Sequence, residues 1–282
     1  MMQITKLFTP VKSLEADEAR DYIAKHREGE YLILDVRQPW EYEDSHIPGA
    51  RLLPLPELAS SYQTLDQEKP TIVHCAVGGR SRVAAQMLNG LGFKEVYNLA
   101  GGLNAYQGRK ATGPRELNLD LVRGDETAAE ITQLACGMER ALQLFYETME
   151  GRTPDSELKT LFLELARVEE VHRQRLLETY RRLEPDSQDE AACADAATPE
   201  TLEGGFNLPE FMATNEAYLD TVPHVLDLAM MLETQALDLY LRFADRGASQ
   251  ATQTILFAIA EEEKVHLARL GRLLEEKLAA RG

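Results

Sequence analysis

One pattern of glutamate and histidine residues occurs twice in this chain, with a shift of 94 residues between the copies. In each copy a lone glutamate lies in an apolar stretch, and a Glu-x-x-His motif follows thirty residues later. A Glu and a His three positions apart share one face of a helix. The repeat therefore predicts two related helix pairs. Their matched polar positions are Glu139 and Glu233, Glu169 and Glu263, and His172 and His266.

The lone glutamates constrain the fold because they lie in the apolar runs GMERALQLFY and AMMLETQALDLY. An ionised carboxylate buried there must be protonated, paired or bound to metal. Four carboxylates and two neutral imidazoles around two divalent cations have no net charge. The pattern of one Glu from each of two helices, with Glu-x-x-His from the other two, is typical of dimetal helical bundles. We therefore predict two iron ions bound by these six residues, with manganese as the alternative and zinc less favoured.

Periodicity and capping signals place four long helices in the second half of the chain. Thr127 and Glu130 form a capping-box pattern, and Thr153 followed by proline is the expected start of the second helix. About 38 residues, 184–221, separate the second helix from the third, which predicts a long crossover between parallel helices. The predicted helices cover residues 127–150, 153–183, 222–245 and 250–279, the last with Ser249 as N-cap.

The first third of the chain alternates short apolar runs with helical patterns, which predicts a parallel α/β sheet. The expected strands are 31–37, 71–76 and 95–100, and the expected helices are about 14–28 and 80–91. The complete chain is thus predicted to be a multidomain protein: an α/β domain, a linker and an all-α four-helix bundle. Their predicted ranges are 1–112, 113–124 and 125–282.

Cys75 lies where a predicted strand ends and a helix begins. Backbone N–H groups of the glycine-containing turn and the helix N-terminus face an anion on the cysteine sulfur. This field, with Arg80, is expected to lower the thiol pKa and favour the nucleophilic thiolate. Cys75 is therefore the predicted catalytic residue. The residues predicted to bind its substrate are Ala76, Val77, Gly78, Gly79, Arg80 and Ser81.

This loop resembles the active-site pattern of rhodaneses, Cys-x-x-Gly-x-Arg-Ser/Thr, and the similarity extends over about residues 5–110. The resemblance implies that the cysteine accepts sulfane sulfur as a persulfide and passes it to a thiol or cyanide. The loop is one residue shorter than that of the related phosphatases. Thiosulfate-specialised members carry cations where this chain has Ala76, Val77 and Gly79, so persulfides or polysulfides remain open as donors. Further matches are Asp35-Val36-Arg37, His46-Ile47-Pro48-Gly49-Ala50 and Gly101-Gly102.

Residues 123–280 resemble the rubrerythrin and ferritin-like di-iron carboxylate superfamily through the repeated ligand pattern. The resemblance implies redox chemistry with O2 or peroxide. Rubrerythrins carry a further glutamate three residues after the ligand of the third helix, where this chain has Ala236. The six-residue set is therefore more similar to bacterioferritin and to minimal di-iron carboxylate proteins.

Charge and cysteine content narrow the expected partners and compartment. Residues 1–112 carry 13 Lys+Arg against 14 Asp+Glu, and the remainder carries 17 against 33. This acidity argues against nucleic acid and anionic membranes as partners. The three cysteines are widely spaced and form no CxxC pair, and the start of the chain has no apolar signal segment. A cytoplasmic location is expected.

Our first hypothesis is a bifunctional sulfur-transfer and redox enzyme. In this view Cys75 carries sulfane sulfur, and the dimetal site performs O2, peroxide or sulfur redox chemistry. The expected partners are small sulfur donors, thiol acceptors, O2 or peroxide, and an electron donor that the sequence does not identify. A homo-oligomer, most simply a dimer, is expected. One alternative is an iron-storage or iron-sensing bundle regulated by the rhodanese domain, and another is a pair of inactive scaffold domains.

Overall fold

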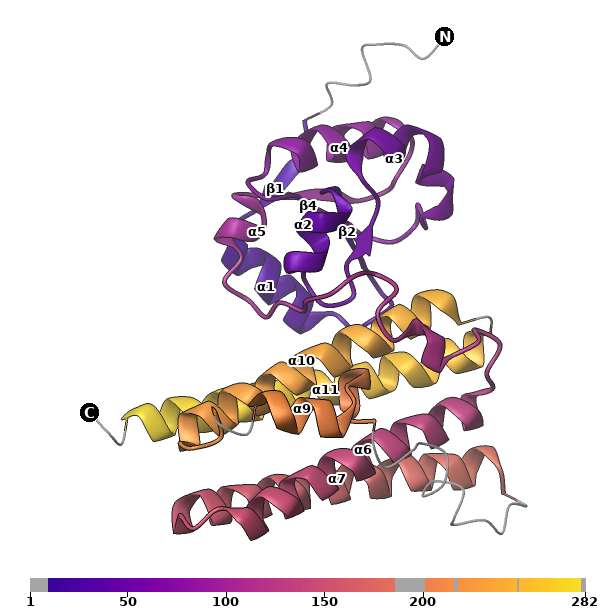
Figure 1. The fold of residues 1–282 in the computed structure, drawn as a ribbon. Coiled ribbons are helices and arrows are strands. Elements are labelled where there is room, and N and C mark those ends of the chain that lie inside the picture. Colours follow the sequence, from indigo (N-terminus) through magenta and orange to yellow (C-terminus); the bar gives the residue numbers. More distant parts are fainter. Residues whose placement is uncertain (1–9, 186–200, 216–217, 248, 280–282) are drawn as a thin grey trace. The chain divides into compact units, whose positions relative to one another are not determined.

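The computed structural model describes residues 10–185, 201–215, 218–247 and 249–279. The chain divides into two compact units, residues 1–117 and 118–282 (Figure 1). The boundary lies within the segment predicted as a linker. Ala111, before this segment, pairs with His46 of the first unit, whereas Val122, within it, is buried in the core of the second.

The first unit contains a five-stranded, wholly parallel sheet with the strand order β1-β5-β4-β2-β3. The predicted parallel α/β fold is confirmed. Sequence reasoning placed the three central strands but missed the two edge strands, β1 and β3, which are two or three residues long. The strands are β1 (Lys12–Leu14), β2 (Leu32–Asp35), β3 (Arg51–Leu52), β4 (Thr71–His74) and β5 (Val96–Leu99).

Both faces of this sheet are buried, which explains why its central strands are continuously apolar. Successive side chains point to opposite faces. Ile33 and Ile72 therefore belong to one core cluster, and Leu34 and Val73 to the other. The helices of this unit are α1 (Ala16–Lys25), α2 (Pro39–Asp44), α3 (Leu55–Ser61), α4 (Gly79–Gly90) and α5 (Gly102–Ala105), with a 3-10 turn, η2, at Tyr62–Thr64.

Four long helices form the second unit, as predicted, and α6 packs along α7 while α10 packs along α11. The capping box of Thr127 and Glu130 is present at the start of α6. Ser249 Oγ accepts a hydrogen bond from the Thr252 N–H at the start of α11. The long helices are α6 (Ala128–Arg152), α7 (Ser156–Leu183), α10 (Val222–Arg246) and α11 (Gln250–Ala279).

The start of α7 differs from the prediction. Asp155, not Thr153, is the N-cap, because its carboxylate accepts hydrogen bonds from the N–H groups of Glu157 and Leu158. Thr153 is instead the C-cap of α6, and its hydroxyl accepts from the Asp155 N–H. Two residues of the turn thus serve different helix ends.

The predicted crossover between α7 and α10 contains structure of its own. A 3-10 turn, η4 (Glu203–Gly205), and a short helix, α9 (Leu208–Asn215), lie within it. Leu202 and Phe211 from this segment are buried in the same cluster as Phe145 and Leu226 of the long helices. The described part of the crossover therefore contributes to the bundle core, while Cys193 lies outside the described residues. A further 3-10 turn, η3 (Leu119–Leu121), precedes α6.

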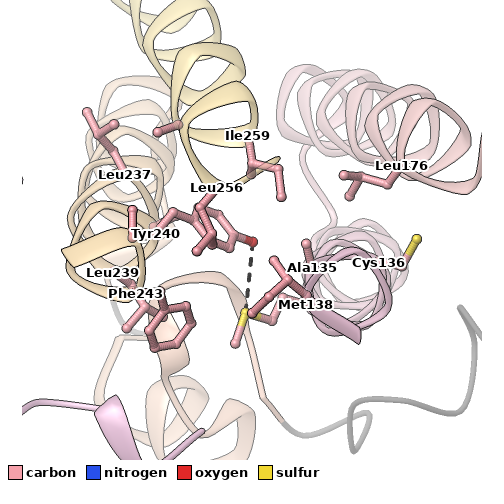
Figure 2. Packing of buried hydrophobic residues seen from close by; sticks show 14 of the residues in the cluster. Ala135, Cys136, Met138, Leu176, Leu237, Leu239, Tyr240, Phe243, Leu256 and Ile259 are labelled. Atoms are coloured by element: carbon pink, nitrogen blue, oxygen red, sulfur yellow. Dashed lines mark hydrogen bonds between the residues drawn. The ribbon is translucent and has the colours of Figure 1, made fainter. Parts of the chain in front are cut away.

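The bundle core also contains the residues drawn in Figure 2. Tyr240 of α10 donates from its hydroxyl toward the Met138 sulfur of α6, 3.9 Å away. Cys136 is fully buried in this cluster. Across the described residues, no helix is long and apolar enough to cross a membrane.

Candidate functional site

The Cys75 loop follows β4 directly and ends in the first turn of α4. Gly78 is the N-cap of α4 and has a left-handed backbone, with φ of 91°. Its N–H donates to Cys75 Sγ at 3.1 Å. The hydroxyl of Ser81 lies 3.4 Å from the same sulfur and 2.7 Å from Asn98 Oδ1, so its single proton is shared between them. The loop therefore surrounds the sulfur with donors.

These donors change the acidity of the thiol. Burial alone would raise the pKa of Cys75, but hydrogen bonds from the Ser81 hydroxyl and from the N–H groups of Ser81, Val77 and Gly78 outweigh it. The pKa of Cys75 is therefore below its ordinary value. A thiolate held in this way is the nucleophilic form of the residue.

Two glycines that follow β5 allow the chain after them to pack closely against the Cys75 loop. The N–H groups of Leu103 and Asn104 donate to the carbonyls of Cys75 and Ala76, at 2.8 and 3.0 Å. Gly102 has φ of +59°, and a Cβ there would lie 2.3 Å from the Cys75 carbonyl oxygen. Only glycine allows the two segments to approach this closely, which explains the Gly101-Gly102 pair.

Arg80, the charged residue of the loop, is engaged by a residue that sequence reasoning did not single out. Its two terminal nitrogens each lie 2.6 Å from an oxygen of Glu41, at the start of α2. Hydrogen bonds from Arg80 hold the pKa of Glu41 down at about 2. The Arg80 pKa is raised mainly by Glu41 and to a smaller extent by the nearby Cys75. The guanidinium thus adds little unpaired positive charge to the loop.

A buried ionic network lies behind the loop. Arg37 and Asp35 form a pair with a shortest distance of 2.6 Å, and Arg37 also donates to the Ser45 carbonyl at 2.6 Å. His74 Nε2 lies 3.7 Å from Asp35, and burial lowers the pKa of His74 to about 4, so this histidine is neutral. These residues connect the ends of β2 and β4, and β4 leads directly into the Cys75 loop.

The six predicted metal-binding residues form two groups of three buried side chains. Within each group, one potential ligand atom from each residue lies within 4.8 Å of the others. The two groups adjoin, because the rings of His172 and His266 stack with centroids 3.3 Å apart and planes 7° from parallel. The first group is Glu139, Glu169 and His172, and the second is Glu233, Glu263 and His266.

The chemistry of this cluster fits two divalent cations. All six residues are at most 6% exposed. Within the described part of the chain, Glu233 Oε2 and His266 Nδ1 are buried without a hydrogen-bond partner, 3.6 Å apart. Burial raises the pKa of Glu169. At Glu233 burial acts in the same direction, but interactions with the neighbouring Glu263 and His266 outweigh it and lower the pKa. Closely packed carboxylates of this kind require protons or cations between them.

A pocket of about 760 Å³ leads to this cluster from between α7 and α11. Glu169, His172, Glu233 and His266 belong to its lining, so the pocket reaches four of the six buried residues. The two helices are antiparallel: Lys277, near the C-terminus of α11, lies 3.1 Å from Glu157, near the N-terminus of α7. Leucines and valines from both helices line the pocket together with charged side chains.

The structure brings all thirteen predicted site residues into two clusters, one in each unit. Val77 of the Cys75 loop is 66% exposed, so the loop faces outward. Tyr146 and Tyr240 lie in the apolar core clusters, and Cys136 belongs to neither group of metal-binding residues. Sequence reasoning missed Glu41 and Asn98, which contact the loop from 39 and 17 residues away and belong to no local motif.

Comparisons with known families agree with this division. The family model described as "Rhodanese-like domain" matches residues 16–109. The model described as "Rubrerythrin" matches residues 130–274, about half of the chain.

Three similar proteins each match about two fifths of the chain or less. "Thiosulfate sulfurtransferase GlpE" of Coxiella burnetii is 35% identical over 112 residues, which are 40% of this chain and 99% of the relative. "Rhodanese-like/PpiC domain-containing protein 12, chloroplastic" of Arabidopsis thaliana is 35% identical over 117 residues, and the match spans only 37% of that protein. The crystal structure of a rhodanese-like domain protein from Staphylococcus aureus matches with 25% identity and a TM-score of 0.33, covering 35% of this chain and 94% of that one.

Proposed function

Because this chain belongs to the rhodanese-like family through its first unit and to the rubrerythrin family through its second, we propose that it is a bifunctional sulfur-transfer and redox enzyme. The proposal assigns persulfide chemistry to Cys75 and O2, peroxide or sulfur redox chemistry to the dimetal residues. The observation that carries it is the coexistence of an activated thiol and a buried six-residue ligand set in one chain.

The sulfur-transfer step is a displacement at sulfur. The Cys75 thiolate attacks the terminal sulfur of a donor persulfide, the donor's S–S bond breaks, and the donor leaves as a thiolate. Cys75 then carries the transferred sulfur as a persulfide, whose negative charge the N–H of Gly78 and the hydroxyl of Ser81 stabilise. An acceptor thiolate takes this sulfur in a second displacement and regenerates Cys75. No net oxidation occurs in either step.

The donor is proposed to be a persulfide or polysulfide. Glu41 neutralises Arg80, and the other loop side chains between Cys75 and Ser81 are uncharged. A donor with one negative charge is stabilised by the loop N–H groups alone. A dianion such as thiosulfate needs an additional cation, which the paired Arg80 does not supply.

In the second unit, we propose that the six residues of the two groups hold two iron ions, with manganese as the alternative. Such ions supply redox and Lewis-acid chemistry when bound. Glu139 and Glu233 come from α6 and α10, and the Glu-x-x-His motifs come from α7 and α11, so all four helices fix the geometry. Burial of these side chains excludes bulk water, and the pocket admits small oxidants.

The two assignments are tested separately on the full chain. After treatment with a small-molecule persulfide, mass spectrometry of the wild-type protein should show one added sulfur, and Cys75→Ser should show none. Cys136→Ser is the matched control and should still load. Metal analysis after anaerobic reconstitution should give close to two iron or manganese ions per chain. Loading that persists in Cys75→Ser overturns the first assignment, and a wild-type protein that takes up neither metal overturns the second.

A further inference from the structure

The pocket above the dimetal residues collects arginines, although the unit around it is strongly acidic. Residues 113–282 carry 33 acidic against 17 basic residues, yet four exposed arginines line this one pocket. None of the four forms an ion pair with any described residue. These arginines are Arg167, Arg175, Arg269 and Arg272.

Two of the arginines are related by the internal repeat. Arg175 follows His172 by three residues, and Arg269 follows His266 by three residues. The spacing of three residues places each of these arginines about one helical turn from a metal-binding histidine, and both arginines line the same pocket as the histidines. The two histidines stack against each other, so both arginines come from the same region of the pocket. The exposed Glu164 and Glu276 also line it, but they lie eight and ten residues from the histidines.

Apart from these charged residues and the four metal-binding side chains, the lining is apolar. Leu161 and Leu165 of α7 and Leu270 and Leu273 of α11 form the walls, and the volume of about 760 Å³ exceeds what water or peroxide requires. Pockets that combine apolar walls with a few placed charges bind organic ligands and orient them through the charged group.

We propose that this pocket binds a small organic anion with an apolar body, whose charged head lies between Arg175 and Arg269. The proposal rests on the proposed function in taking this anion as a substrate of the dimetal centre. The apolar body lies against the leucines, and the head is adjacent to His172 and His266. The arginines thereby select an anion in a domain whose net charge repels anions elsewhere.

The test compares octanoate with octanol, two probes of equal chain length that differ in charge. Calorimetric titration of the zinc-loaded full chain should show octanoate binding at least about tenfold more tightly than octanol. The double variant Arg175→Gln/Arg269→Gln should lose most of that preference while octanol binding is unchanged. The control Arg152→Gln/Arg182→Gln removes the same charge from the ends of α6 and α7, outside the pocket, and should retain the preference.

Three outcomes overturn the proposal. Equal affinity for octanoate and octanol removes the role of charge, and equal losses in both double variants remove the role of position. The third is a change of oligomeric state in Arg175→Gln/Arg269→Gln, measured by light scattering, which would make this face a contact between two copies. The exposed Val171 and Val265 flank the arginines and would belong to such a contact. The titration is repeated on metal-free protein, and the metal content of every sample is measured. Together these two measurements separate failure of the dimetal assignment from failure of the pocket.

Discussion

Glu41→Gln should change the donor preference of Cys75, because it releases Arg80 from its ion pair. A free guanidinium about 6 Å from the charge of a bound donor contributes roughly 1 kcal/mol per unit charge at an effective dielectric constant of about 55, between the values for a protein surface and for water. Thiosulfate, with two charges, therefore gains roughly 1 kcal/mol more than a persulfide with one. We expect the ratio of kcat/KM for thiosulfate to that for a persulfide to rise about fivefold.

Two variants control this experiment. Glu43→Gln makes the same charge change on the same helix and should leave the ratio unaltered, since within the described residues Arg80 pairs with Glu41 and not with Glu43. Glu41→Gln/Arg80→Gln has neither charge and should return the ratio close to the wild-type value. The reasoning is refuted if Glu41→Gln leaves the ratio unchanged, or if Glu43→Gln shifts it equally.

The ion pair between Glu41 and Arg80 should also make the stability of the protein depend on pH under acidic conditions. The pKa of Glu41 is depressed from 4.5 to about 2 in the folded protein. Its contribution to stability is therefore fully present above pH 4.5 and is lost as the pH falls toward 2. Because the Arg80 side chain is 37% exposed, we discount the corresponding energy to about 1 kcal/mol. The stability difference between wild type and Glu41→Gln, measured by urea unfolding, should shrink across this interval.

Three further perturbations test the sites and the packing that supports them. Ser81→Ala should raise the pKa of Cys75, so the midpoint of its alkylation rate against pH should move upward; an unchanged midpoint would leave the backbone donors as the sole cause. Gly102→Ala should destabilise the first unit by about 2–3 kcal/mol in urea unfolding, because of its φ of +59° and the Cys75 carbonyl. Gly92→Ala, with φ of +99° but open space, should cost only about 1 kcal/mol, and equal costs would contradict the steric argument. Glu233→Gln should reduce the bound metal by about one ion per chain while raising the melting temperature of the metal-free protein, because it removes a buried charge; full metal occupancy would count against Glu233 as a ligand.

The helices of the bundle were predictable to within a few residues because their signals are local. Periodicity, the capping box at Thr127 and the N-cap at Ser249 all act over one or two turns. The start of α7 was misplaced because Thr153 and Asp155 are both good caps, and their roles depend on where α6 ends. The edge strands β1 and β3 were missed because two or three residues carry no periodicity.

The sequence by itself pointed to the residues that we propose carry the chemistry, because glutamate in an apolar helix and cysteine before a glycine turn are costly without a role. It also determined that the Glu and the His of each Glu-x-x-His motif share one helix face, since residues three positions apart do so in any α-helix. Only the tertiary structure decided that His172 stacks on His266, that Glu41 neutralises Arg80 and that arginines surround the pocket. These contacts join residues 94, 39 and about 100 positions apart. These contacts form only when the loops reverse the direction of the chain and the helices pack against one another. Local sequence patterns do not predict either event.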